Sequence, residues 1–387
     1  MSPSPKVSIL LPSLNARKFL EPRIESLLNQ TFAGWEAIVL DSHSNDGTWE
    51  FLQPVAQRDS RFQLHQIPRE GLYAAINHGI DLATGEFIYV ATADDTMAPQ
   101  FLTRMLDAFS RCPEAAIAAC DALFIDGDGH KLTPANPELK RRLSSRAIME
   151  LLELATVRTA FLGEEQNQIN YRPAPHDSLI YFSGRSVYCS LTQLLIRTES
   201  ARAIGPFRTE IGSVADFDWL LRATSRFGTV HLPQKLATWR FHGEQLSIYR
   251  DPGRGSVQTM CEQILPEICQ RHTLALTRND RAALLLPIKM RLARSPITRA
   301  YYRFETALRL CWMILRRPAP TLRALRRSKF RFATRRHTLI PMIFQGLGLA
   351  PKDVETGEVE QVESRVVSTT QPLNNHTSAS TISRTKS

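Results

Sequence analysis

Two neighbouring aspartates, Asp94 and Asp95, end the segment EFIYVATADD of residues 86–95. Inside a strand, neighbouring side chains point to opposite faces of the sheet, so the pair could not act on one ligand there. Where a strand ends, the backbone can turn and aim both carboxylates at the same group. Two like charges held this close are costly unless a cation lies beside them. Because Mg²⁺ and Mn²⁺ prefer oxygen ligands, the pair predicts a divalent-cation site that faces phosphates.

The elements that position this pair alternate along residues 7–125. Short β-branched runs such as VSILLP and WEAIVLD are separated by longer amphipathic segments. This alternation predicts an α/β fold with a mostly parallel central sheet flanked by helices. Ligands of such sheets bind outside the carboxyl ends of the strands. We therefore expect Pro12 to Asn15, Asp41 and the two aspartates to lie on one rim.

Two common phosphate-binding signatures do not occur in this sequence. No G-x-G-x-x-G follows the first expected strand, which argues against a dinucleotide-binding Rossmann domain. No G-x-x-x-x-G-K-[ST] occurs either, which argues against a P-loop kinase. Carboxylates and short polar side chains stand at the expected rim instead, so a metal-bridged phosphate site is favoured.

The 387 residues are 43% apolar, which is enough for a substantial core. The first residues lack the pattern of a signal peptide, and no run approaches the ~18 apolar residues of a membrane span. The six cysteines show no disulfide framework spacing. We therefore expect a cytoplasmic protein with reduced thiols. The expected parts are a domain over 1–250, a basic helical extension over 251–350 and a disordered Ser/Thr-rich tail over 351–387. Within the domain we expect a nucleotide-binding half over about 6–130, a polar insertion with one helix over about 132–185, and an acceptor and catalytic half over about 186–250.

The net charge of +10 is concentrated near the C-terminus, because residues 275–340 are rich in Arg and contain only Asp280 and Glu305 as acids. This segment has three interpretations: membrane attachment, a solvated helical cap and a nucleic-acid surface. The apolar, Arg-flanked run FETALRLCWMILRR of residues 304–317 suits a helix lying on an anionic membrane, at the inner face. A helical cap with a solvated basic face is the second interpretation. No nucleic-acid-binding module is visible, so we expect no nucleic-acid partner.

Five segments taken in order resemble the family 2 glycosyltransferases of the GT-A fold, over about residues 6–250. The resemblance implies an inverting transfer of a sugar from a nucleotide-diphosphate donor to an acceptor hydroxyl, with a divalent cation, Mg²⁺ or Mn²⁺. The segments are LPSLN (11–15), DSHSNDGT (41–48), REGLYAAINHGIDLATGE (69–86), TADD (92–95) and ADFDWLLR (215–222).

The resemblance also implies which residues bind the nucleotide. Pro12, Ser13 and Asn15 match the family's first strand-end turn beside the base. Asp41 matches the acid that accepts a hydrogen bond from the base, a role that suits a carboxylate facing a ring N–H. Arg69 is expected to stabilise the departing nucleotide diphosphate. A UDP-sugar is the favoured donor.

The remaining roles belong to four further residues. By the family's pattern Asp94 lies towards the ribose and Asp95 holds the metal, and His242 matches a position close to the metal or diphosphate. Asp216 matches the catalytic base, which takes the proton of the acceptor hydroxyl as the new bond forms.

The sequence also bears on the kind of transfer. The Q-x-x-R-W segment typical of processive polysaccharide synthases is absent after the ADFD segment, which favours transfer of a single sugar. We expect a role in cell-surface polysaccharide or glycolipid synthesis, with a saccharide or a lipid-linked acceptor. The alternative is a catalytically silent sugar-nucleotide-binding or scaffold protein of the same fold. The intact Asp95 and Asp216 argue against silence.

Overall fold

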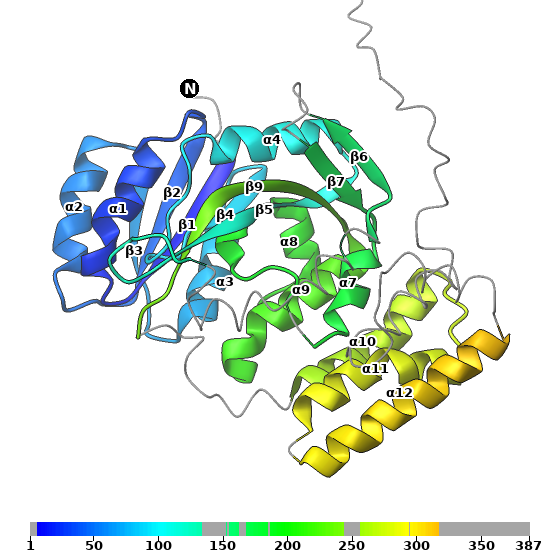
Figure 1. Cartoon of the computed structure of the whole chain (residues 1–387). Helices are drawn as coiled ribbons and strands as arrows, with labels where there is room; N and C mark the ends of the chain where they lie inside the picture. Colours follow the sequence, from blue (N-terminus) through cyan, green and yellow to red (C-terminus); the bar gives the residue numbers. More distant parts are fainter. Residues whose placement is uncertain are drawn as a thin grey trace, which may run out of the picture. The chain divides into compact units, whose positions relative to one another are not determined.

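A nine-stranded sheet forms the centre of the structure, with its strands in the order β3-β2-β1-β4-β8-β5-β9-β7-β6 (Figure 1). The computed structural model describes residues 6–133, 152, 155–161, 168–184, 186–243, 256–293 and 295–316. The strands are β1 (Val7–Ser13), β2 (Trp35–Asp41), β3 (Phe62–Gln66), β4 (Phe87–Val90), β5 (Ala115–Ile125), β6 (Arg158–Phe161), β7 (Gln168–Arg172), β8 (Leu194–Arg197) and β9 (Gly228–Arg240). The helices are α1 (Arg17–Leu28), α2 (Thr48–Arg58), α3 (Leu72–Leu82), α4 (Phe101–Arg111), α7 (His176–Tyr181), α8 (Thr198–Ile204), α9 (Ala215–Arg226), α10 (Ser256–Arg271), α11 (Arg278–Leu292) and α12 (Pro296–Arg316), with short 3₁₀ turns η1 (Leu191–Gln193) and η2 (Thr209–Val214).

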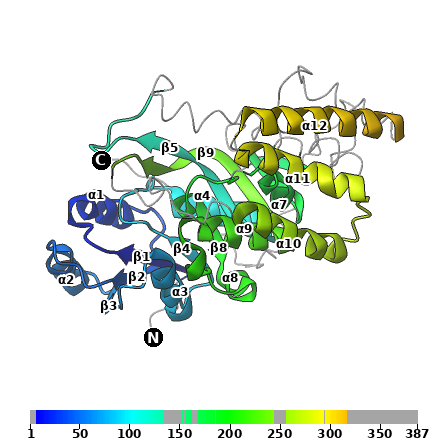
Figure 2. The same cartoon turned by 90° about the horizontal axis from the view of Figure 1, so that it is seen from below.

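Helices cover both faces of the sheet, and alternate residues of β1 show this directly. Ile9 and Leu11 are fully buried in a hydrophobic core that includes residues of α1 and α4. Leu10 points to the opposite face and is fully buried in a second core with residues of α3 and α9. The expected α/β sheet flanked by helices is therefore confirmed. Figure 2 shows the same layers from below.

The sheet is mixed, so the expectation of a mostly parallel sheet holds for one part of it. Strands β1 to β4 pair only in parallel with one another, which brings their carboxyl ends to one rim. Strand β8 then inserts antiparallel between β4 and β5, and β6 and β7 add an antiparallel edge beside β9. The parallel part is therefore the part that can gather loop residues around a ligand.

Strand β9 carries the chain back to the rim, although its sequence pattern does not indicate a strand. It pairs in parallel with β5, and the register shifts around Asp121, where Leu232 and Lys235 face successive residues of β5. A proline inside the run and this bulge interrupt the alternation of side chains that marks a strand. Beyond β9, Phe241 N donates to Ile125 O, which keeps the following residues next to the rim.

Helices α10 and α11 share a hydrophobic core with α9. Ile268 and Leu284 are fully buried in the core that also contains Trp219 of α9. Two polar contacts connect α9 to α10. Arg226 forms an ion pair with Glu267 at 3.0 Å, and the ring of His272 forms a hydrogen bond with Ser225 O. Most of the helix expected in the insertion, residues 317–350 of the extension and the tail from 351 lie outside the described residues.

A buried ion pair connects β7 to α7. Arg172 Nε donates to Asp177 Oδ1 at 2.5 Å, and both side chains are almost fully buried. Tyr188 Oη donates to the other carboxylate oxygen at 2.8 Å and accepts a hydrogen bond from Arg172. Burial opposes the charge of Asp177, yet the charge and hydrogen bond of Arg172 leave its pKa below the usual value. This cluster therefore depends on all three partners.

The ion pair gives a stability prediction. Asp177→Ala leaves the Arg172 charge buried and unpaired, so we expect a loss of about 3–5 kcal/mol in the free energy of unfolding. The matched control is Glu114→Ala, which removes an exposed ion pair with Arg158 and should cost less than about 1 kcal/mol. Urea unfolding midpoints of the variants measure both effects. Equal losses would contradict this account.

Candidate active site

The carboxyl ends of β1 and β2 meet at Ser13 and Asp41, which face each other in the parallel register. Ser42 N donates to Ser13 O across the same rim. Asp41 is fully buried, and its two carboxylate oxygens accept hydrogen bonds from the backbone N–H and the hydroxyl of Ser44 at 3.0 and 2.5 Å. Asp41 therefore orders the loop that follows β2.

The loops after β1 and β2 hold each other in an unusual conformation. Asn15 and His43 have positive φ angles of 50° and 53°, a region that residues other than glycine rarely adopt. Asn15 N donates to the Ser44 hydroxyl, and Asn45 N donates to Asn15 Oδ1, both at 2.9 Å. Strained backbone held by reciprocal contacts is common at ligand sites. Leu14, at the tip of the first loop, is 49% exposed.

Arg69 joins the same loops from the connection between β3 and α3. Its Nε donates to Ser42 O at 2.9 Å, and its guanidinium also contacts His43 O. Contacts among the two loops therefore bring Ser13, Asn15, Asp41 and Arg69 together, and Pro12 lies in β1 immediately before Ser13. These are five of the six residues that the sequence assigns to the nucleotide sugar; the sixth, Asp94, lies beyond the end of β4.

The turn after β4 buries Asp95 among hydrogen-bond donors. Its Oδ1 accepts from Arg240 N at 2.8 Å. Its Oδ2 accepts from the hydroxyls of Thr92 and Thr192 at 2.9 and 3.2 Å. These donors come from the turn itself, from η1 and from the end of β9, so one carboxylate connects three distant segments of the chain.

Asp94 points to a different partner and is more exposed. Its Oδ2 lies 3.0 Å from His242 Nε2, and its side chain is 26% exposed. The His242 ring packs against Phe19 with the ring centres 4.8 Å apart. Arg240 Nε donates to the Asp94 carbonyl at 2.7 Å. Asp94, Asp95 and His242 therefore form one cluster beyond the end of β4.

The electrostatics of this cluster favour a cation. Burial and the neighbouring charge of Asp94 raise the pKa of Asp95 to about 7. Burial also opposes the charge of Asp94, but the hydrogen bond from His242 leaves the pKa of Asp94 below its usual value. Arg23, fully buried below the turn, donates to Thr92 O and supplies a positive charge that favours ionised Asp95. A carboxylate pair that cannot ionise fully by itself, beside an imidazole, fits a divalent cation.

A second acidic group lies in the tight turn after β5. Ligand atoms of Asp126, Asp128 and His130 lie within 4.8 Å of one another on the surface. Asp126 N donates to His130 O, which closes the turn. Arg240 donates from its Nη1 to Asp126 O and Gly127 O, so this turn touches the residue that also holds Asp94 and Asp95.

Asp216 occupies the first turn of α9, a helix that contributes no residue to the other two clusters. Its Oδ1 accepts a hydrogen bond from Phe217 N at 2.6 Å. Burial raises the pKa of Asp216 to about 6, against this hydrogen bond. Tyr73 of α3 lies nearby, and burial and the charge of Asp216 raise the pKa of its phenol. Asp216 is therefore a carboxylate whose proton affinity suits exchange near neutral pH.

Asp218, two residues later, has a different environment. Its carboxylate is buried and accepts from Arg222 Nε at 2.9 Å and from Arg208 at 3.2 Å. Arg222 also donates to Ile204 O and Pro206 O. Asp218 therefore joins α9 to the turn after α8, and the two acids of the ADFD segment are not interchangeable.

Sequence reasoning misses three residues that build the site: Arg23, Thr192 and Arg240. Arg240 holds Asp94, Asp95 and the Asp126 turn from the far end of β9. The signal available for Arg240 is its place two residues before His242, in a segment already singled out. Thr192 lies in a capping box, S-L-T-Q. This pattern indicates a helical turn but does not indicate that the Thr192 hydroxyl donates to Asp95.

The fold is that of the GT-A glycosyltransferases. A solved structure of S. aureus TarS, residues 1-349 in complex with UDP-GlcNAc, superposes with a TM-score of 0.52 over 89% of this chain and 90% of that chain, at 14% identity. A second crystal structure of S. aureus TarS gives a TM-score of 0.50 over 75% of this chain and 44% of that chain, at 14% identity.

Sequence comparison gives a family match for part of the chain and several relatives. Residues 8–161, which are less than half of the chain, match the family described as glycosyl transferase family 2. A putative teichuronic acid biosynthesis glycosyltransferase, TuaG of Bacillus subtilis, is 32% identical over 104 residues, which are 27% of this chain and 41% of the relative. The GalNAc(5)-diNAcBac-PP-undecaprenol beta-1,3-glucosyltransferase of Campylobacter jejuni is 34% identical over 104 residues, 26% of this chain and 34% of the relative. These alignments span less than half the length of each relative.

The raised pKa of Asp216 predicts a pH-dependent stability. The protonated form is favoured in the folded state, so this contribution is complete below the ordinary pKa of 3.8 and is lost as the pH rises through about 6. Asp216→Asn should therefore have a higher Tm than the wild type at pH 7.5, and the two should converge near pH 4. Exposed Glu210→Gln is the control and should show no such pH-dependent difference. A Tm gain independent of pH would contradict the assignment.

Proposed function

We propose that this protein transfers a single sugar from a nucleotide-diphosphate donor to an acceptor hydroxyl with inversion at the anomeric carbon. The observation that carries the proposal is the pair of separate acidic sites on one GT-A sheet. Asp94, Asp95 and His242 form a cluster suited to a cation and phosphates, and Asp216, on a different element, has a pKa of about 6. In a direct displacement, one group binds the departing nucleotide diphosphate and another takes the proton of the attacking hydroxyl. Two acidic sites on different elements fit these two tasks.

Asp216 supplies the base in this proposal. With a pKa of about 6, it is mostly ionised at neutral pH and still basic enough to take a proton. As the acceptor oxygen bonds to the anomeric carbon, its proton passes to the Asp216 carboxylate. The bond to the nucleotide diphosphate breaks on the opposite side, so the anomeric configuration inverts. The backbone N–H of Phe217 holds the carboxylate in place.

Asp95 and His242 are the proposed metal ligands, with Asp94 on the ribose side. Oδ2 of Asp95 already accepts hydrogen bonds from two threonine hydroxyls, so ligation through this atom requires one hydroxyl to give way. Asp94 and His242 are bonded to each other, and a ligand would separate them. When bound, Mg²⁺ or Mn²⁺ supplies charge neutralisation for the departing diphosphate.

Pro12, Ser13, Asn15, Asp41 and Arg69 are the proposed nucleotide-binding residues. Leu14 offers an exposed apolar surface beside them for a base. Asp41 is buried against Ser44, so a hydrogen bond to the base requires the loop after β2 to shift. Because the TarS structure contains UDP-GlcNAc, UDP-sugars are the first donors to test.

The relatives point to a biological setting. Their names refer to teichuronic acid synthesis and to an undecaprenol-linked saccharide. We propose a saccharide or lipid-linked acceptor in cell-surface polysaccharide or glycolipid synthesis, with the protein at the cytoplasmic face of the membrane. None of the described helices is long and apolar enough to cross a membrane. The proposed attachment is therefore peripheral and anionic-lipid-dependent, through the basic C-terminal helices.

The base assignment predicts a separation of binding from transfer. Asp216→Asn should lower kcat by about 10²–10⁴-fold, because the acceptor hydroxyl loses its proton acceptor. Donor affinity should change little, because Asp216 belongs to α9, which contributes none of the proposed nucleotide-binding residues. Transfer assays with a panel of nucleotide sugars and Mn²⁺ measure the first effect, and calorimetry with UDP measures the second.

Glu210→Gln is the control for this experiment and should keep wild-type transfer. Full activity of Asp216→Asn would remove this residue from the mechanism. Wild-type protein that binds no nucleotide sugar at all would contradict the whole proposal, and binding without turnover would favour a silent scaffold.

The metal assignment predicts which acid controls cation affinity. Asp95→Asn should weaken Mn²⁺ binding in the presence of UDP by at least about tenfold, because a ligand charge is lost. Asp128→Asn, in the exposed turn after β5, is the matched control and should bind Mn²⁺ like the wild type. Calorimetry of Mn²⁺ binding gives both values. The reverse order would place the cation in the Asp126–His130 turn and overturn the assignment.

A further inference from the structure

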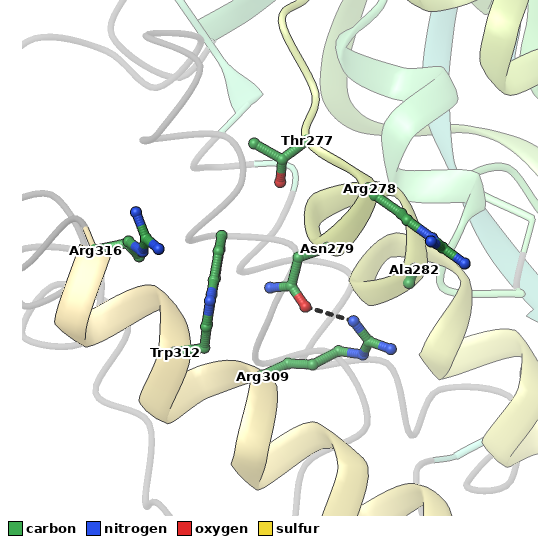
Figure 3. A pocket seen from close by; sticks show the side chains of 7 residues that line it. All are labelled: Thr277, Arg278, Asn279, Ala282, Arg309, Trp312 and Arg316. Carbon is green, nitrogen blue, oxygen red and sulfur yellow. Dashed lines mark hydrogen bonds between the residues drawn. The ribbon is translucent and has the colours of Figure 1, made fainter.

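A groove of about 640 Å³ lies between α11 and α12, outside the site described above. Three arginines line it: Arg278 from the first turn of α11, and Arg309 and Arg316 from α12 (Figure 3). Trp312 stands between the two α12 arginines, and its ring lies 5.7 Å from the Arg316 guanidinium. The groove therefore combines several guanidinium groups with one aromatic wall.

Two acidic residues near the groove, Glu305 and Asp280, already accept hydrogen bonds from other residues. Glu305 accepts two hydrogen bonds from Arg309, at 2.6 and 3.0 Å. Asp280 accepts from the backbone N–H and hydroxyl of Thr277, so it points back towards the cap of α11. One arginine is thus neutralised by Glu305, and the lining keeps an excess of positive charge from Arg278 and Arg316.

Asn279 adds a donor without an acceptor. Its Oδ1 accepts from Arg309 Nη1, so its amide orientation is fixed. Its Nδ2 is buried and has no hydrogen-bond partner within the described residues. Figure 3 shows this nitrogen on the Trp312 side of the groove. An unpaired buried donor is costly, and an anionic oxygen beside Trp312 would satisfy it.

The outer face of α12 is apolar next to this groove. Five large apolar side chains are exposed at spacings of three or four residues, which places them on one side of the helix. They are Ile297, Tyr301, Phe304, Leu308 and Trp312. Trp312 belongs to both surfaces, so the apolar stripe runs into the groove. At ~100° per residue, Arg309 and Arg316 lie beside one edge of the stripe, whereas Arg299 and Arg303 lie on the far side of the helix.

We propose that the groove between α11 and α12 binds the phosphate of an anionic phospholipid headgroup while the apolar stripe of α12 lies in the membrane interface. Guanidinium groups and an amide N–H are the donors that phosphate oxygens prefer. An apolar face bordered by arginines is the composition of interfacial helices. This inference deepens the proposed peripheral attachment and names its binding site.

The apolar stripe decides between a lipid and other anions. Free phosphate or a nucleic acid would use the arginines but would leave Ile297, Phe304 and Leu308 in water. A phospholipid satisfies both surfaces at once, because its phosphate and its acyl chains are joined. The shared chemistry with free phosphate is the oxyanion, and the experiment separates the two sources.

The test uses the full chain and vesicles of phosphatidylcholine alone or mixed with phosphatidylglycerol. In a sedimentation assay, the wild-type protein should bind the mixed vesicles at least about tenfold more tightly than vesicles of phosphatidylcholine alone. The reason is that each arginine near an anionic surface contributes to binding. Arg278→Gln/Arg316→Gln should lose most of this preference. Arg299→Gln/Arg303→Gln removes the same charge from the far side of α12 and should keep it. Equal losses in the two double variants would overturn the groove as the binding site.

Two further arms address the stripe and the phosphate source. Ile297→Ser/Phe304→Ser should weaken binding to both kinds of vesicle and leave the lipid preference intact. Inorganic phosphate at millimolar concentration should compete with mixed vesicles for wild-type protein, but not for the groove double variant. Wild-type protein that binds phosphate and neither vesicle would show a free-phosphate site and overturn the lipid assignment.

Failure of this inference is distinguishable from failure of the proposed transfer. Sugar transfer to a water-soluble acceptor uses Asp216 and the Asp94–Asp95 cluster, and the groove lies apart from both. The groove double variant should therefore keep wild-type kcat with such an acceptor, whatever the vesicles show. A loss of transfer to the soluble acceptor in this variant would contradict the separation of the two sites.

Discussion

The site depends on one buried carboxylate. Asp95 lies where β4 ends, and its hydrogen bonds come from Thr92, from Thr192 and from the backbone of Arg240, 145 residues away. Burying a charge is costly unless donors or opposite charges compensate for it. These donors, a longer hydrogen bond from the Ser190 hydroxyl and the buried guanidinium of Arg23 compensate for this cost. The same burial keeps the proton affinity of Asp95 high, so a cation can still lower the free energy of the cluster.

The two acidic centres use burial in different ways. At Asp95, burial and the neighbouring charge of Asp94 disfavour the ionised carboxylate. A bound cation would offset both effects. At Asp216, burial without a cationic partner raises the pKa towards neutrality, against the hydrogen bonds from the backbone N–H groups of Phe217 and of Asp216 itself. Asp218, close by in the same helix turn, is stabilised by two arginines and serves packing. The fold therefore gives these three acids three different environments, and Asp216 and Asp218 differ although only one residue separates them in the sequence.

Sequence reasoning finds the parts of this design that are local. The buried runs of β1 and β2 and the polar residues after them follow from the pattern alone, and so does the turn at Asp94. The partners of Asp95 do not follow, because they come from elements far away in the sequence. Strand β9 is missed because a proline and a bulge near Leu232 break its alternation. Arg23 is missed because a charged residue in an amphipathic helix is normally expected to face solvent.

The shared core of α9, α10 and α11 limits how the chain can be divided. Trp219, Ile268 and Leu284 belong to one set of buried side chains, so the helices after β9 are not an appendage attached by a tether. A chain shortened before α10 would leave an apolar face of the α9 layer open to water, with aggregation as the expected result. The exposed face of α12 lies outside this shared core, so single substitutions on that face can change the surface of the protein without disturbing the packing of α9, α10 and α11.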